Sequence, residues 1–254
     1  MTTTRHALML SSLLLAACAQ TPFSDGGGIQ SPGTEALQNY YKSPNPDRAL
    51  SMIQGLIENR TWSKRPDMQR NLAIWASQIL KQSPQATDKW CNAVKRYDIT
   101  TQHQAAYLFH LAGTPESRKC FQELDIDDNI KQAALNSATP DLLATEGRTI
   151  TDLNGYWAVY YATGNPQAIE KMLSVIQNGI RTGTVESDKT TAATVQSLRQ
   201  NMRRDPVING IVQNHIGRLG GADRSAMNRL LPNTGGLRNS LKASGSALMK
   251  RLPF

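Results

Sequence analysis

The sequence predicts an all-α fold built from antiparallel helical hairpins that stack in a solenoid-like array. Aromatic residues make up only 6% of the chain, while Ala, Gln, Asn and Leu are plentiful, and this composition favours helices over strands. Prolines that follow a polar residue recur along the chain, as they do at helix starts, and no convincing run of alternating strand residues separates them. The patterns divide the chain into residues 1–17, 18–33, 34–217 and 218–254.

Residues 1–17 are predicted to be a secretory signal peptide. Arg5 and His6 precede an apolar stretch that runs to Leu15, and two alanines follow it. The apolar stretch is shorter than the about 20 residues that a membrane-spanning helix needs. The segment therefore predicts export from the cytoplasm and absence from the mature protein.

The end of this segment, Leu15-Ala16-Ala17-Cys18, resembles the lipobox of bacterial lipoproteins. The resemblance implies cleavage before Cys18, diacylation of its thiol and acylation of the new amino terminus. Two or more acyl chains are sufficient for stable membrane anchoring. In the sorting scheme of this family an Asp at the next position retains the protein at the inner membrane, so Ala19 implies an outer-membrane lipoprotein that faces the periplasm. The alternative is an ordinary signal peptide in which Cys18 is incidental.

Residues 18–33 are predicted to be a flexible tether between the lipid and the folded part. The stretch from Thr21 to Gly33 contains three consecutive glycines and two prolines, and it has little apolar surface to bury. A chain of this kind has a typical span on the order of 20 Å. The tether would therefore keep the folded part near the membrane.

Residues 34–217 are predicted to be a helical domain because one short pattern recurs in them: a polar residue, then Pro, then usually Asp, Glu or Gln. It occurs at Asn45-Pro46-Asp47, Ser83-Pro84-Gln85, Thr114-Pro115-Glu116, Thr139-Pro140-Asp141 and Asn165-Pro166-Gln167, with looser copies at Arg65-Pro66-Asp67 and Asp205-Pro206-Val207. The polar side chain can accept from free backbone N–H groups, and proline fits the first helical position. An acid in the first turn suits the helix dipole. Each copy therefore predicts a helix start.

Helical periodicity follows these starts. A large apolar residue lies six positions after four of the prolines, namely Met52, Trp90, Phe121 and Met172. Apolar residues also recur at spacings of three and four, as in Leu72, Trp75, Ala76 and Ile79 and then in Ala105, Ala106, Phe109 and Ala112. The stretch from Arg181 to Ser187 is predicted to be a loop. Short connections make successive helices antiparallel neighbours, and many of them in sequence predict a solenoid.

One hairpin resembles a tetratricopeptide-type repeat. Tyr160-Tyr161-Ala162-Thr163-Gly164-Asn165-Pro166 followed by Ala168-Ile169 is similar to the end of one repeat helix, its turn and the next helix, and Asn45-Pro46-Asp47-Arg48-Ala49-Leu50 is a weaker copy. The likeness covers residues 35–215 at the level of architecture, without a steady 34-residue period. It implies a protein that binds other proteins, as outer-membrane lipoproteins of this type do when they assemble envelope or secretion complexes.

The cysteine pair Cys91 and Cys120 is predicted to form a disulfide. Cys91 lies seven residues after Pro84 and Cys120 lies five after Pro115, so both occupy the second turn of helices that are next but one in sequence. Such helices run parallel and adjacent in a solenoid, and an oxidising periplasm preserves disulfides. The bond would close a loop of roughly 30 residues and stabilise the fold by about 3.5 kcal/mol. Two buried free thiols are the alternative.

The sequence predicts neither a metal site, nor a cofactor, nor an enzyme. His103 and His110 are two helical turns apart, about 10.5 Å, which is too far for one metal ion. Asp125, Asp127 and Asn129 match the start of a calcium loop, but the required Gly and Glu are missing, so Asp127 and Asp128 are predicted to cap a helix near Asn129. The chain has no phosphate-binding loop and no nucleophile elbow.

The densest aromatic cluster consists of Tyr156, Trp157, Tyr160 and Tyr161. On a helix these residues form two adjacent stripes, 156/160 and 157/161. Two interpretations stay open. The stripes pack in the core against neighbouring helices, or one stripe lines a groove that receives a partner peptide, because aromatic residues dominate interface anchors.

The excess of positive charge lies at the C-terminal end. Residues 1–198 hold 18 Lys and Arg and 18 Asp and Glu, whereas the remainder holds ten basic residues against Asp205 and Asp223, which accounts for the net charge of +8. Residues 218–254 are predicted to be a Gly-rich tail, either disordered or amphipathic. Its leucines at 237, 241, 248 and 252 lie near one helical face, and the basic residues are Arg238, Lys242, Lys250 and Arg251. A cationic amphipathic helix binds anionic membrane surfaces.

These patterns favour a membrane-anchored, helical-repeat adaptor or assembly factor for an envelope or secretion complex. A second hypothesis is a binder of anionic envelope lipid or polymer that acts through the basic tail. An envelope enzyme is the third alternative, and it would need a pocket in which carboxylates or histidines converge. Nucleic acid is not an expected partner on the periplasmic route. Deletion of residues 218–254 separates the first two hypotheses, since only the second predicts a loss of binding with the folded body intact.

Overall fold

The protein is all-α in the computed structural model, which describes residues 32–59 and 66–234. In these ranges every regular element is a helix, so the predicted fold class is confirmed. The elements are α1 (Pro32–Gln38), η1 (Tyr40–Lys42), α2 (Pro46–Glu58), α4 (Pro66–Gln82), η2 (Pro84–Ala86), α5 (Thr87–Val94), α6 (Ile99–Ala112), α7 (Pro115–Glu123), α8 (Asp128–Leu135), α9 (Ile150–Thr163), α10 (Pro166–Thr182), α11 (Lys189–Arg204), α12 (Pro206–Arg218) and α13 (Gly221–Leu230). Cys18 and the basic residues Arg238, Lys242, Lys250 and Arg251 lie outside the described residues.

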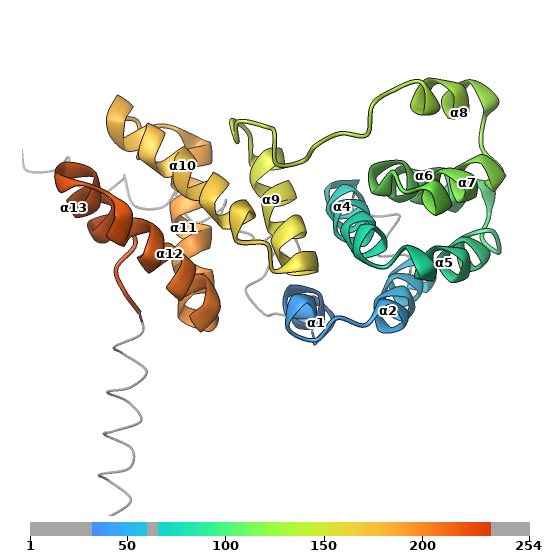
Figure 1. Ribbon diagram of the computed structural model, residues 1–254, viewed down its shortest axis with the longest axis horizontal. Coiled ribbons are helices and arrows are strands. Elements are labelled where there is room, and N and C mark those ends of the chain that lie inside the picture. The colour runs from blue at the N-terminus through green and yellow to red at the C-terminus, as the bar shows by residue number, and fades with distance from the viewer. Residues whose placement is uncertain (1–31, 60–65, 235–254) are drawn as a thin grey trace, which may run out of the picture.

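Two lobes meet at the pair of helices α4 and α9 (Figure 1). The N-terminal lobe consists of α2 and α4–α8, and the C-terminal lobe consists of α9–α13. Within each lobe, helices that are next but one in sequence pack together: α4 with α6, α5 with α7, α9 with α11 and α10 with α12. None of the helices in the described ranges combines the length and the hydropathy that crossing a membrane requires.

The segment α1–η1 packs across the meeting point of the lobes. Leu37 on α1 is buried, and the ring of Tyr40 meets Trp75 of α4 edge-on, with 5.1 Å between centroids. The ring of Tyr41 lies 4.9 Å from that of Tyr160 on α9. The beginning of the described chain is therefore held on both lobes.

Most of the predicted helix starts are confirmed. The side chains of Asn45, Thr114, Asn165 and Asp205 accept hydrogen bonds from backbone N–H groups in the first turns of α2, α7, α10 and α12. Asp127 caps α8 in the same way, as its sequence context predicts. After Ser83 the chain first makes the short 3-10 turn η2, and α5 begins three residues later.

The helix start predicted at Thr139-Pro140-Asp141 is wrong. Residues 136–149 contain no helix, and the Asp141 carboxylate accepts a hydrogen bond from the backbone N–H of Leu143 at 2.9 Å. Asp side chains bind the backbone two residues ahead in turns as readily as they cap helices. The local pattern therefore does not distinguish the two outcomes.

The apolar positions expected to follow the prolines are largely in the core. Trp90, Phe121 and Met172 are buried, and Met52 is partly buried and packs against the core cluster. Cys91 and Cys120 are joined by the expected disulfide, with 5.7 Å between their Cα atoms. The bond links α5 to α7, the next-but-one helices on which the prediction rests.

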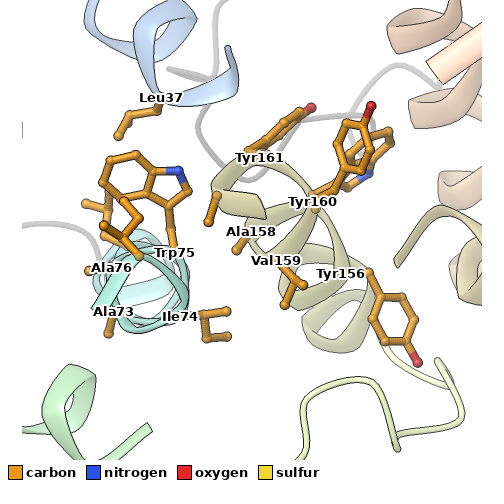
Figure 2. Packing of buried hydrophobic residues seen from close by; sticks show 14 of the residues in the cluster. Leu37, Ala73, Ile74, Trp75, Ala76, Tyr156, Ala158, Val159, Tyr160 and Tyr161 are labelled. Carbon is orange, nitrogen blue, oxygen red and sulfur yellow. The ribbon is translucent and has the colours of Figure 1, made fainter. Parts of the chain in front are cut away.

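The aromatic cluster lies in the core and not in a partner groove. Tyr156, Trp157, Tyr160 and Tyr161 are each at most 1% exposed. Figure 2 shows Tyr156, Tyr160 and Tyr161 on α9. Trp157 Nε1 donates to Ser197 Oγ at 3.2 Å, and the Tyr161 hydroxyl donates to Asn201 Oδ1 at 2.9 Å. Both acceptors lie on one face of α11, so α11 covers the 157/161 stripe. The sequence alone does not indicate which helix covers this stripe.

The folded body continues beyond residue 217, where the sequence places the start of the tail. Helix α13 packs on α10 and α12, and both Met227 and Leu231 are fully buried. Gly217, Gly220 and Gly221 give this region the composition of a tail. The apolar pair four residues apart is nevertheless sufficient to hold one more helix on the body.

Candidate functional site

An irregular connection of residues 136–149, here called the strap, joins α8 to α9 and so links the two lobes (Figure 1). Connections longer than about 12 residues without secondary structure are uncommon in compact domains and are often functional. Leu142 and Leu143 of the strap are partly buried against the core. The strap is therefore a packed part of the fold.

The second half of the strap is held by specific contacts. The Tyr156 hydroxyl donates to the carbonyl oxygen of Thr145 at 2.7 Å, and Thr145 Oγ1 lies 2.9 Å from the same hydroxyl. Thr190 Oγ1 donates to the Arg148 carbonyl at 3.2 Å. Burial raises the pKa of Tyr156, so this phenol keeps its proton and remains a donor at neutral pH.

Gly147 allows the strap to approach α10 closely. Its φ is +70°, and a Cβ at this position would lie 2.6 Å from Val175 Cγ2. A positive φ and the lack of space together require glycine here. The same residue thus sets both the turn of the strap and its distance from α10.

Between the strap, α10 and the start of α11 lies an open groove of about 670 Å³, here called the strap groove. Lys171, Ser174 and Asn178 stand at intervals of three and four along α10 and form its polar floor. Glu146, Gly147 and Arg148 form one wall, and Asp188 and Thr191 form the other.

The charges in the strap groove are mostly satisfied within the protein. Glu146 and Arg148 form an ion pair. Asp188 caps α11, and the hydrogen bonds from the Thr191 hydroxyl and N–H hold its pKa below the ordinary value. Lys171 makes no ion pair within the described ranges, so its ammonium group is the cation that a ligand in the groove can meet.

A second depression, of about 370 Å³, lies beside the first half of the strap. Its lining comes from the last turns of α4 and α9 and from the first half of the strap, and it includes Lys81 and Asp141. Burial lowers the pKa of Lys81, and the charge of Asp141 opposes this effect. Each half of the strap therefore lines a hollow of its own.

Neither hollow was indicated by the sequence. The aromatic stripe offered as a groove is core, and the helix start predicted at Thr139 lies in the strap itself. The polar run from Asn136 to Thr139 was the available signal for an irregular segment. Within residues 32–59 and 66–234 no group of three or more His, Cys, Asp or Glu side chains could hold a metal ion.

Comparisons of the chain with protein families, with curated proteins and with solved structures give no match.

Proposed function

We propose that the protein is a membrane-anchored helical adaptor that holds an extended segment of an envelope or secretion-complex protein in the strap groove. The observation that carries this proposal is the groove itself, with its polar row on α10. Its volume of about 670 Å³ is within the range of ligand sites. The partner would thus be recognised by the folded body.

The row of Lys171, Ser174 and Asn178 suits a peptide in extended conformation. Seven residues of helix span about 10 Å, which equals about three residues of an extended chain. Ser174 and Asn178 are exposed and can bind main-chain groups, while Lys171 suits an acidic side chain or a terminal carboxylate. An acidic or C-terminal segment is therefore the proposed ligand.

The arrangement of helices supports the comparison with tetratricopeptide-type proteins. In such arrays each helix packs on the next helix and on the next but one. Helices α9, α10, α11 and α12 show both kinds of contact, and in the N-terminal lobe α5, α6 and α7 pack in succession while α4 packs on α6 and α5 on α7. The hairpins α6–α7 and α9–α10 also share a turn, since Gly113 and Gly164 end the first helices in the left-handed conformation and a capping Thr or Asn and a Pro follow. We propose that each lobe is a short solenoid of this kind.

The proposed location is the outer membrane, with the folded body in the periplasm. The support is the sequence Leu15-Ala16-Ala17-Cys18, with Cys18 as the acylated residue. The disulfide between Cys91 and Cys120 suits the same compartment, because oxidising surroundings preserve such bonds. Labelling with a radioactive fatty acid tests the anchor: wild type is expected to be labelled and Cys18→Ser is not.

The groove is tested by capture of partners from detergent-solubilised envelope with bound proteins identified by mass spectrometry. Ser174→Trp fills the groove, and Ser225→Trp is the matched control. Both serines are exposed on a helix, and each hydroxyl donates to the carbonyl four residues earlier. A partner lost with Ser174→Trp and kept with Ser225→Trp supports the proposal; a partner kept by both variants contradicts it.

The excess of basic charge favours the second candidate, a binder of anionic lipid or polymer through the tail. Because α13 belongs to the body, the informative deletion begins at residue 235 and not at 218. Loss of all binding in a chain truncated after Thr234 would favour the tail over the strap groove.

A further inference from the structure

Both ends of the described fold meet at the C-terminal end of α11. Near the first end, Lys42 Nζ lies 2.7 Å from Asp205 Oδ2. Near the last, Thr234 Oγ1 donates to the carbonyl of Met202 at 3.0 Å. Arg203 and Arg204 stand between these two contacts in the sequence. Lys42 and Thr234 therefore contact the two residues, Asp205 and Met202, that flank the arginines in the sequence.

These arginines present positive charge to solvent. Arg203 and Arg204 are exposed, and neither forms an ion pair with a described residue. One turn earlier, the guanidinium of Arg199 donates to the carbonyl oxygens of Leu230 and Arg229. These acceptors carry no net charge, so they do not neutralise the guanidinium. The neighbouring acid, Asp205, is buried and already bound by Lys42. The local charge is therefore strongly positive.

An apolar side chain stands beside the arginines. Val207, in the first turn of α12 and two residues after the buried Asp205, is 49% exposed. Basic residues around an exposed apolar group are typical of protein surfaces that lie in the membrane interface, where the apolar group enters the headgroup region. The charge and the valine therefore favour the same kind of partner.

We propose that this basic end, formed by Arg199, Arg203, Arg204 and Val207, binds the phosphate groups of an anionic lipid bilayer. Arginine forms paired hydrogen bonds to phosphate oxygens, and basic residues near an anionic leaflet each strengthen binding severalfold. The inference rests on the proposed membrane anchor for the nearness of a bilayer. An anchored chain with a tether that spans on the order of 20 Å would keep the folded body, and with it the basic end, near a bilayer.

The binding orients the body as well as holding it. With the basic end on the bilayer, the C-terminal end of α11 and the N-terminal end of α12 both lie at the membrane. Thr234, the last described residue, is bound at the same end of α11.

The test is co-sedimentation of the unacylated mature chain, residues 18–254 with Cys18→Ser, with vesicles of phosphatidylcholine alone or mixed with phosphatidylglycerol. We expect binding to the mixed vesicles only, weakening as salt rises. The double variant Arg203→Ala and Arg204→Ala is expected to bind about 25-fold more weakly, at about fivefold for each arginine. The matched control, Arg96→Ala with Lys119→Ala, removes two exposed charges from the N-terminal lobe and is expected to bind as the parent chain does.

Three results would overturn the proposal. The first is equal binding by the double variant and the control, which would assign vesicle binding to the tail. The second is equal binding to neutral and anionic vesicles. The third is Arg203- and Arg204-dependent binding to a soluble anionic polysaccharide with no binding to vesicles. Should the double variant lose stability in a thermal melt, Val207→Ser replaces it, with a severalfold loss expected. Because no acyl chain is present, failure here leaves the proposed anchor and the strap groove untouched.

Discussion

Lys42, near the start of the described fold, forms an ion pair with Asp205, the residue that connects α11 to α12, with 2.7 Å between Nζ and Oδ2. The same carboxylate accepts from the Tyr41 hydroxyl at 2.6 Å and from the Val207 N–H at 2.9 Å. One buried side chain therefore fixes the N-terminal segment and the beginning of α12 together.

Asp205→Asn is expected to lower the free energy of unfolding by about 2–3 kcal/mol, because it removes a charge-assisted pair and weakens a helix cap. Urea denaturation measures the change. Asp223→Asn is the control, since its pair with Arg181 is largely exposed and should contribute less than about 1 kcal/mol. Equal effects of the two substitutions would contradict the role assigned to Asp205.

Asp205 also predicts a dependence on pH. Burial raises the pKa of its carboxyl, but the hydrogen bonds from Lys42, Tyr41 and Val207 outweigh this, so the pKa lies below the ordinary 3.8. With the folded-state pKa below the unfolded one, the stabilisation is complete above about pH 4 and is lost as the pH falls through the folded-state value. The stability difference between wild type and Asp205→Asn should shrink below pH 4. A difference that stays constant down to pH 2 would argue against the ion pair.

The disulfide predicts sensitivity to reduction. Cys91 and Cys120 are 29 residues apart, and opening this loop is expected to cost about 3.5 kcal/mol. Thermal melts with and without dithiothreitol measure the cost. Cys18→Ser should respond to the reductant as wild type does, whereas Cys91→Ser with Cys120→Ser should not respond at all.

The strap predicts a contrast between two glycines with nearly the same φ. Gly147→Ala and Gly183→Ala both place a side chain in the left-handed region, at about 1 kcal/mol, but only the first also meets Val175. We expect Gly147→Ala to cost about 1–2 kcal/mol more and to speed hydrogen exchange in residues 141–149. If both variants exchange alike there, the strap does not depend on its contact with α10.

Trp157 distinguishes a core residue from a binding residue. Trp157→Ala is expected to destabilise the fold by about 3–5 kcal/mol, and Trp157→Phe by about 1–2 kcal/mol through loss of the bond to Ser197. Chemical denaturation gives both values. In capture experiments below the melting temperature of the variant, Trp157→Phe should keep the partner. A folded variant that loses the partner would support the interpretation that the aromatic stripe binds a partner peptide.

The helix starts could be predicted from sequence because a cap is a local contact. Asn165 and Thr114 act within three residues of themselves, so their neighbours in the chain contain the necessary information. Thr139 shows the limit of such reasoning, since the same polar residue and proline there begin a turn. Whether a turn or a helix forms depends on how residues 136–149 fit between the two lobes.

The candidate sites depend on contacts between distant residues. The stripe of Trp157 and Tyr161 was visible in the sequence, but Ser197 and Asn201, which cover it, lie 40 residues away. The strap groove needs the strap, α10 and α11 together, and no local pattern brings them to one place. The excess of charge after Leu198 was visible, whereas its location beside Lys42 was not.

The docking of η1 determines where a pull on the N-terminal side reaches the protein. Tyr40 contacts Trp75 on α4 and Tyr41 contacts Tyr160 on α9, so tension applied through residue 32 passes into the two helices at which the lobes meet. Lys42 also pairs with Asp205, so part of the load reaches the junction of α11 and α12. A pull on residue 32 is therefore shared between the central pair of helices and the start of α12. The strap groove shares this load, because Tyr156 on α9 holds the wall that the strap forms.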